Sequence, residues 1–117
     1  VSDLVVCRAG ATTIAELTRL GKPALLVPYP HAAANHQVEN ARSLAASGAA
    51  EIVYDHESLA GLGTRILAAL DEGRLSEMSV RSRKLGKPEA ALRIAERVIL
   101  LARRDQRQAA AAAGVTR

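Results

Sequence analysis

Near its N-terminus the chain reads DLVVC over residues 3–7, and RAGATT follows over residues 8–13. The apolar run is rich in β-branched residues and predicts a buried strand. The small residues after it predict a turn, and a helix is expected to begin at Thr12 or Thr13. We expect that helix to run to about Leu20, with Gly21 as its C-cap. A strand, a turn and a helix in this order indicate the first half of a βαβ unit.

The same alternation continues along the chain. Two more apolar runs predict strands, and four more segments predict helices. The strands are expected over Ala24–Pro28 and Ala50–Tyr54, and the helices over Asn35–Ser47, Glu57–Asp71, Arg74–Leu85 and Glu89–Arg104. The strands lack a regular polar alternation, which is typical of parallel strands covered on both faces. The predicted fold class is therefore α/β, with a partial Rossmann-like parallel sheet and C-terminal helices.

The length of 117 residues fits one domain. Three strands are fewer than a doubly wound sheet usually has, and the sequence opens directly on a strand. We therefore expect the chain to be a fragment, or its sheet to be completed elsewhere. Residues 1–104 are expected to form the folded part, and residues 105–117, rich in Gln and Ala, a disordered tail.

Composition narrows the functional classes. The chain has two Tyr and neither Trp nor Phe, so it lacks the aromatic platforms on which single-stranded nucleic acid stacks. Residues 81–107 hold nine Lys or Arg against three acidic residues. Such a run can serve nucleic acid or an anionic membrane surface, but a solvated helix face is the favoured interpretation. No nucleic-acid partner is expected.

Cys7 is the only cysteine, so no disulfide framework exists within the chain. Its apolar neighbours indicate a small hydrophobic residue at the end of a buried strand, and a reactive thiol beside Arg8 is the alternative. No run approaches the roughly 20 apolar residues that span a bilayer. No signal peptide is visible either, so a cytoplasmic location is expected.

The turn from Arg8 to Thr13 is the first candidate site. Ligands of open parallel sheets bind beyond the carboxyl ends of the strands. The helix that follows offers unpaired N–H groups and a partial positive charge, which suit a phosphate. Thr13 and Glu16 also fit a capping box, in which Thr13 is the N-cap and Glu16 reaches back to it. The alternative is that Glu16 accepts hydrogen bonds from the two hydroxyls of a ribose, and the residues alone favour the cap.

The loop after the second strand, Pro28–His31, leads into the second candidate site. Asn35, His36, Gln37 and Asn40 lie within the first two turns of the next helix. Side-chain amides both donate and accept hydrogen bonds, which suits sugar hydroxyls. The alternative interpretation is that Asn35 caps the helix and that the other three side chains are solvated. His31 and His36 have no acidic or thiol partner at ligand spacing, so a metal is the least favoured interpretation.

At these two loops the chain resembles the MurG family of bacterial glycosyltransferases, in glycosyltransferase family 28. Five segments match in order and with the right spacing, and the similarity continues more loosely to about Arg104. The segments are Cys7–Leu17, Gly21–Ala24, Val27–Pro30, Asn35–Ala41 and Gly48–Ala50.

The resemblance implies a GT-B fold, with residues 1–104 as the C-terminal part of its donor-binding domain. The implied reaction is transfer of N-acetylglucosamine from UDP-GlcNAc to a lipid-linked acceptor, lipid I to lipid II, in peptidoglycan synthesis. By position Glu16 would hold the ribose. The diphosphate would be held by Ala11, Thr12 and Thr13. Gln37 and Asn40 would bind hydroxyls of N-acetylglucosamine, with His36 adjacent.

The resemblance implies no metal or other cofactor, and a family member acts peripherally on the cytoplasmic face of the cell membrane. Family members are much longer than this chain. Their N-terminal domain, which binds the acceptor and supplies the proposed general base, has no counterpart here, so no catalytic residue is assigned. We expect the chain alone to be inactive. The alternatives are another GT-B glycosyltransferase, or a non-catalytic interaction module with a decayed site.

Overall fold

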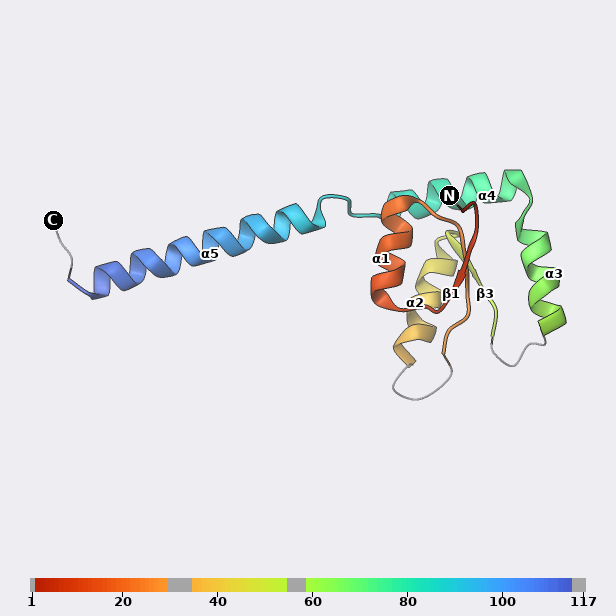
Figure 1. The fold of residues 1–117 in the computed structure, drawn as a ribbon, viewed down its shortest axis with the longest axis horizontal. Coiled ribbons are helices and arrows are strands. Elements are labelled where there is room, and N and C mark those ends of the chain that lie inside the picture. Colours follow the sequence, from red (N-terminus) through yellow and green to blue (C-terminus); the bar gives the residue numbers. More distant parts are fainter. Residues whose placement is uncertain (1, 30–34, 55–58, 115–117) are drawn as a thin grey trace. The chain divides into compact units, whose positions relative to one another are not determined.

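Strands and helices alternate through a computed structural model that describes residues 2–29, 35–54 and 59–114 (Figure 1). The described elements are, in chain order, β1 (Val5–Cys7), α1 (Ala11–Leu20), β2 (Ala24–Leu26), α2 (Asn35–Ala46), β3 (Ala50–Ile52), α3 (Leu59–Ala69), α4 (Glu72–Leu85) and α5 (Ala90–Ala112). This order confirms the predicted α/β class.

The three strands form one parallel sheet in the order β1-β2-β3. Ala24 pairs with Val5 on one side and with Ala50 on the other. Each strand has only three residues, fewer than expected. Around β2 the reason is visible, because Pro23 and Pro28 flank the strand and neither has an N–H group for the ladder.

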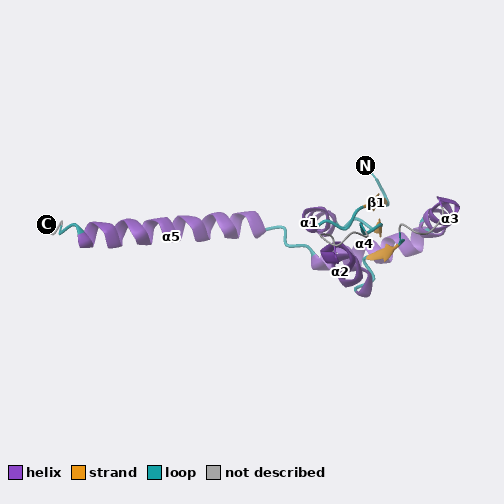
Figure 2. Ribbon diagram, turned by 90° about the horizontal axis from the view of Figure 1, so that it is seen from below, coloured by secondary structure: helices purple, strands orange, loops and turns teal. Residues whose placement is uncertain are grey.

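One face of the sheet carries the hydrophobic core. Val5, Ala24 and Ala50 share this face because they are paired, and the side chains two residues further along each strand share it as well. Leu17 from α1 and Leu44 from α2 pack here, and both are almost fully buried. Figure 2 shows α1 and α2 on this side of the strands and α3 on the other.

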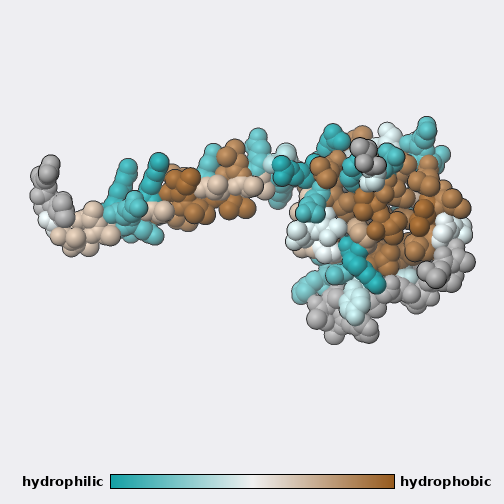
Figure 3. All heavy atoms as spheres, in the orientation of Figure 1, coloured by the Kyte–Doolittle hydropathy of each residue, from teal (hydrophilic) through white to brown (hydrophobic). Residues whose placement is uncertain are grey.

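The opposite face is only partly covered, contrary to the expectation for parallel strands. It presents the paired residues Val6, Leu25 and Glu51. Leu25 is inaccessible, whereas Val6 is 41% exposed. Apolar side chains gather around the sheet in the space-filling view (Figure 3). Val6 lies on the edge strand β1, which is where a further strand or helix would cover it.

Helix α1 begins earlier than predicted, and the capping box is wrong. Its N-cap is Gly10, which makes no side-chain cap, and the N–H of Ile14 donates to the Gly10 carbonyl at 3.0 Å. Thr13 therefore lies inside the first turn and is not the N-cap residue. Glu16 then has no N-cap N–H of Thr13 to bind, as a capping box would require. The C-terminal prediction is confirmed, because Gly21 ends the helix with φ 64°.

Helices α3 and α4 are anchored to the sheet through Glu51. Its half-buried carboxylate forms ion pairs with Arg65 of α3, at 3.7 Å, and with Arg74 of α4. Asp71 caps α4 by accepting a hydrogen bond from the Arg74 N–H at 2.9 Å, so this helix starts at Glu72 rather than at Arg74. The expected start of α3 at Glu57 lies outside the described residues.

Helix α5 belongs to a second unit, residues 88–117, separate from the unit of residues 1–87. It continues to Ala112, past the predicted end at Arg104. None of its side chains is buried. Apolar and basic side chains both follow its length (Figure 3). Among the described helices, none is long and apolar enough to cross a membrane.

Candidate functional site

The start of α1 carries unpaired backbone donors at the carboxyl end of β1. Within the described residues, the N–H groups of Ala11, Thr12 and Thr13 donate to no acceptor. The first turn also holds no acidic residue that would offset the positive end of the helix dipole. Ala11 and Thr12 are exposed and Thr13 is half-buried. The predicted turn is thus open to an anion from solvent.

Glu16 lies one turn further along the same helix. It is three residues after Thr13 and four after Thr12, so the three side chains share a face. Glu16 is exposed, and its carboxylate forms no ion pair or hydrogen bond with any described residue. Because the capping box does not form, this carboxylate is available to a ligand.

The second predicted loop is joined to the first by Asn40. Its side-chain NH2 donates to the carbonyl of Ala9 at 3.2 Å, across 31 residues of sequence. Gln37 lies one turn earlier in α2, and its side-chain carbonyl accepts a hydrogen bond from the N–H of Tyr29 at 3.1 Å. The two amides therefore lie at the same sheet edge as the start of α1.

These bonds fix the polarity of both amides. Gln37 uses its carbonyl within the protein, so its NH2 group remains to donate to a ligand. Asn40 uses its NH2 group, so its carbonyl oxygen remains to accept. A donor beside an acceptor matches a pair of sugar hydroxyls. The structural and ligand-binding interpretations of these residues are compatible.

Sequence reasoning missed Arg8 as an organising residue. Its guanidinium donates to the carbonyls of Val27 and Pro28, at 3.2 and 3.4 Å, and lies over the ring of Tyr29 at 5.4 Å from the centroid. Nothing local in the sequence signals a contact across 19 residues. The arginine directly after a buried strand was the available hint.

Four further residues belong to the predictions made for this edge. His36 is exposed in the first turn of α2. The structure gives no placement of His31, and nothing of the Asn35 side chain, so the helix cap predicted for Asn35 lies outside what it describes. Cys7 packs against the core, as predicted, and burial raises the pKa of its thiol. A raised pKa disfavours the thiolate and therefore the alternative of a nucleophile.

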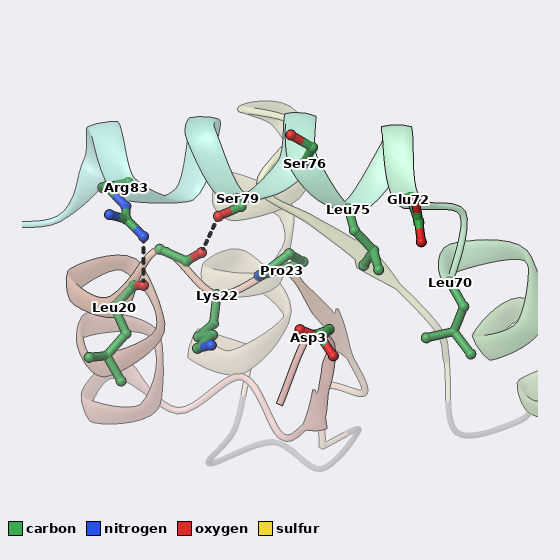
Figure 4. A pocket seen from close by; sticks show the side chains of 11 residues that line it. Asp3, Leu20, Lys22, Pro23, Leu70, Glu72, Leu75, Ser76, Ser79 and Arg83 are labelled. Atoms are coloured by element: carbon green, nitrogen blue, oxygen red, sulfur yellow. Dashed lines mark hydrogen bonds between the residues drawn. The ribbon is translucent and has the colours of Figure 1, made fainter. Parts of the chain in front are cut away.

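A hollow of about 560 Å³ lies at the opposite edge of the sheet (Figure 4). It is bordered by Asp3 and by Gly21–Pro23, which precede β1 and β2, and by side chains of α4. Ser79 donates to the Gly21 carbonyl at 2.7 Å and Arg83 to the Leu20 carbonyl at 3.5 Å. None of the predicted site residues borders it, and both Ser79 and Arg83 bond backbone carbonyls at the end of α1.

Comparison with known proteins finds similarity over most of the chain. Residues 1–98 match the family model of the glycosyltransferase family 28 C-terminal domain. The chain is 48% identical over 104 residues to the UDP-N-acetylglucosamine–N-acetylmuramyl-(pentapeptide) pyrophosphoryl-undecaprenol N-acetylglucosamine transferase of Chlorobium limicola, covering 87% of this chain and 29% of that relative. It is 51% identical over 106 residues to the transferase of the same name from an Anaeromyxobacter species, covering 88% and 28%.

A solved structure is similar as well. The crystal structure of Acinetobacter baumannii MurG matches with a TM-score of 0.73 at 34% identity, covering 81% of this chain and 29% of that one. This chain therefore spans less than a third of the length of the curated relatives it matches. The sequence, the parallel sheet and the extent of the match agree: the chain belongs to the glycosyltransferase family 28 C-terminal domain family.

Proposed function

We propose that this chain is the donor-binding part of an N-acetylglucosaminyltransferase that uses UDP-GlcNAc and converts lipid I to lipid II in peptidoglycan synthesis. The observation that carries the proposal is the open start of α1 beside Asn40. Its unpaired N–H groups form a seat for a diphosphate, and the Asn40–Ala9 hydrogen bond puts a sugar-binding amide next to that seat.

The proposed roles follow the order of the ligand. The exposed carboxylate of Glu16 accepts hydrogen bonds from the ribose hydroxyls. The N–H groups of Ala11–Thr13 and the hydroxyl of Thr13 bind the diphosphate. Gln37 donates to one hydroxyl of N-acetylglucosamine and Asn40 accepts from another, as their fixed polarities dictate. His36 lies beside them.

In the reaction, the bond between the sugar and the diphosphate breaks, and negative charge grows on the diphosphate. Preorganised N–H groups at a helix start stabilise charge that develops in a transition state. This gives residues 11–13 a role in leaving-group stabilisation without a metal. The attacking hydroxyl belongs to the lipid-linked acceptor. The residues that bind this acceptor and the base that takes its proton are proposed to lie outside this chain.

The cellular setting belongs to the same proposal. An enzyme that glycosylates a lipid-linked acceptor works at the cytoplasmic face of the cell membrane, and its product serves cell shape and cell division. The similarity of the chain to named MurG transferases supports this placement.

Titration of the purified chain with UDP-GlcNAc tests the binding part of the proposal. We expect chemical-shift changes at the amides of Ala11–Thr13 and at the side-chain amides of Gln37 and Asn40. UDP, which lacks the sugar, should shift only the amides of Ala11–Thr13. A matched control is Glu39→Gln, since Glu39 is exposed on α2 and, among the residues that the structure describes, pairs with Arg42 alone, at 3.3 Å.

A turnover assay tests whether catalysis requires residues outside this chain. The 117-residue chain alone should transfer no sugar, whereas a chimera in which the preceding part of the Chlorobium limicola enzyme is joined before Val1 should. Absence of UDP-GlcNAc binding even in that chimera would contradict the proposal and favour a decayed module. Activity with a different acceptor would favour another GT-B enzyme.

A further inference from the structure

Arg8 forms part of a closed set of contacts at the proposed site. From its place after β1 it donates to the carbonyls of Val27 and Pro28, which follow β2. The same guanidinium lies over the ring of Tyr29. One side chain thus holds three consecutive residues of the second loop.

The set closes through helix α2. The N–H of Tyr29 donates to Gln37 at 3.1 Å, and Asn40 donates to the carbonyl of Ala9 at 3.2 Å. Ala9 is bonded directly to Arg8 and is inaccessible to solvent. We name this set the inter-loop ring, and it comprises Arg8, Ala9, Val27–Tyr29, Gln37 and Asn40.

The ring joins the two halves of the proposed donor site. Ala9 leads through Gly10 into the N–H groups of the diphosphate seat, whereas Gln37 and Asn40 carry the sugar-binding groups. Each ring contact crosses at least eight residues of sequence. The relative position of seat and sugar amides therefore depends on contacts between loops and on no single element.

The contacts of Arg8 define its role. A guanidinium is a planar fork that can serve two carbonyls and stack on a ring at once, whereas a lysine ammonium is a point charge that cannot do all three. We propose that Arg8 is a positioning residue that fixes the spacing between diphosphate seat and sugar amides before the ligand binds, and that it is not a phosphate ligand. This inference rests on the proposed function.

Two substitutions separate geometry from charge. Arg8→Lys keeps the positive charge but loses the planar guanidinium. Arg8→Met keeps an apolar side chain but loses both the charge and the guanidinium. If Arg8 acts by position, both variants weaken binding of UDP-GlcNAc by a similar factor, roughly tenfold for the loss of contacts of this kind. Binding of UDP should change little, because UDP needs only the first loop. Arg42→Lys and Arg42→Met, on an exposed pair of α2, are the controls.

A second measurement does not depend on ligand. In both Arg8 variants the Tyr29 amide should exchange its hydrogen faster, and the side-chain NH2 resonances of Asn40 should shift. The far-ultraviolet circular dichroism should stay unchanged, since Arg8 is exposed and outside the core.

Two results would overturn the inference. One is that Arg8→Lys retains affinity while Arg8→Met loses it equally for UDP and UDP-GlcNAc, with strong dependence on salt, because that is the behaviour of a phosphate ligand. The other is an unchanged Tyr29 amide in both variants. If the unsubstituted chain binds neither nucleotide, the proposed function fails, and the Tyr29 and Asn40 signals alone decide whether Arg8 holds the ring.

Discussion

In the sequence, Glu16 fits two roles, a capping box with Thr13 and a contact with a ribose. In the structure the capping box does not form. The pattern of Thr13 and Glu16 fits a capping box, which would occupy the carboxylate. The structure begins α1 at Ala11 instead, and Gly10 caps it without a side chain. The carboxylate of Glu16 is thereby released from the cap, and its exposure on α1 makes a ligand role testable by itself.

Replacing Glu16 with Gln should separate binding from stability. Hydrogen bonds to a charged group contribute about 1.5–3 kcal/mol, so affinity for UDP should fall roughly 10- to 100-fold. The urea midpoint should stay unchanged because no cap is lost. Calorimetric titration and urea unfolding measure the two effects, with Glu39→Gln as the control. Unchanged affinity for UDP would contradict the proposed contact between Glu16 and the ribose.

The burial of Cys7 predicts how the reactivity of its thiol depends on pH. Burial raises the pKa of its thiol above the ordinary value, so the thiolate forms only at higher pH than in a free cysteine. The rate of alkylation by iodoacetamide should therefore rise at higher pH in the folded chain than in the chain unfolded in urea. A rate that rises at lower pH in the folded chain would indicate an activated thiol instead.

At the scale of the elements, α4 supports the ends of two helices. Ser82 donates to the carbonyl of Lys22 at 3.2 Å and Arg83 to that of Leu20 at 3.5 Å, at the C-terminal end of α1. Arg81 lies against Gly48, after the end of α2. Cations near the C-terminal ends of helices oppose the negative end of each dipole. Helix α4 thereby fixes α1 and α2 at the edge opposite the proposed site.

Gly86 is the position where this packing should be most sensitive. A Cβ added there would lie 2.5 Å from the backbone oxygen of Thr18, so either α1 or the end of α4 must move. We expect Gly86→Ala to destabilise the chain by about 1–3 kcal/mol. Gly63→Ala, within α3, has no atom within 4 Å of the added Cβ and should stabilise by about 0.5–1 kcal/mol. Urea unfolding of both variants measures the difference, and equal effects would show that α4 does not pack on α1.

At the scale of the whole molecule, the three-stranded sheet is a small core. Within residues 2–29, 35–54 and 59–114, no strand pairs with the outer edge of β1, and Val6 on that strand is 41% exposed. Short sheets with an open edge bury little apolar surface and invite mispairing. We expect marginal stability, and a broad thermal transition in circular dichroism would agree with it. A sharp cooperative transition well above ambient temperature would contradict it.

The second unit makes its own prediction. Helix α5 has no buried side chain among the described residues, so it lacks the tertiary packing that supplies most helical stability in proteins. Its amides should exchange hydrogen much faster than those of α1, and fastest in residues 105–112, where the sequence predicts a disordered tail. Hydrogen exchange followed by mass spectrometry measures this. Slow exchange through α5 would mean that a partner covers its apolar side chains.

Most of the architecture could be predicted from local sequence. Apolar runs such as Val5–Cys7 and Ala24–Leu26 indicated strands because short continuous apolar runs are typical of strands buried on both faces. Gly21 and Gly48, with φ 64° and 73°, mark helix ends because a residue without Cβ adopts these angles easily. The boundaries were less accurate, since Ala11 and Thr12 join α1 once the Gly10 carbonyl accepts its first bond.

The candidate site divides in the same way. The sequence by itself singled out the residues proposed to bind a nucleotide sugar, through residue type, through spacing along one loop or helix, and through the resemblance to a known family. Only the tertiary structure decided that Glu16 is released from a cap, that Gln37 accepts a hydrogen bond from Tyr29 while Asn40 donates one to Ala9, and that Arg8 joins the two loops. The state of Glu16 depends on where α1 begins, at Gly10. The other contacts are hydrogen bonds between segments distant in sequence, and local patterns carry no information about such partners.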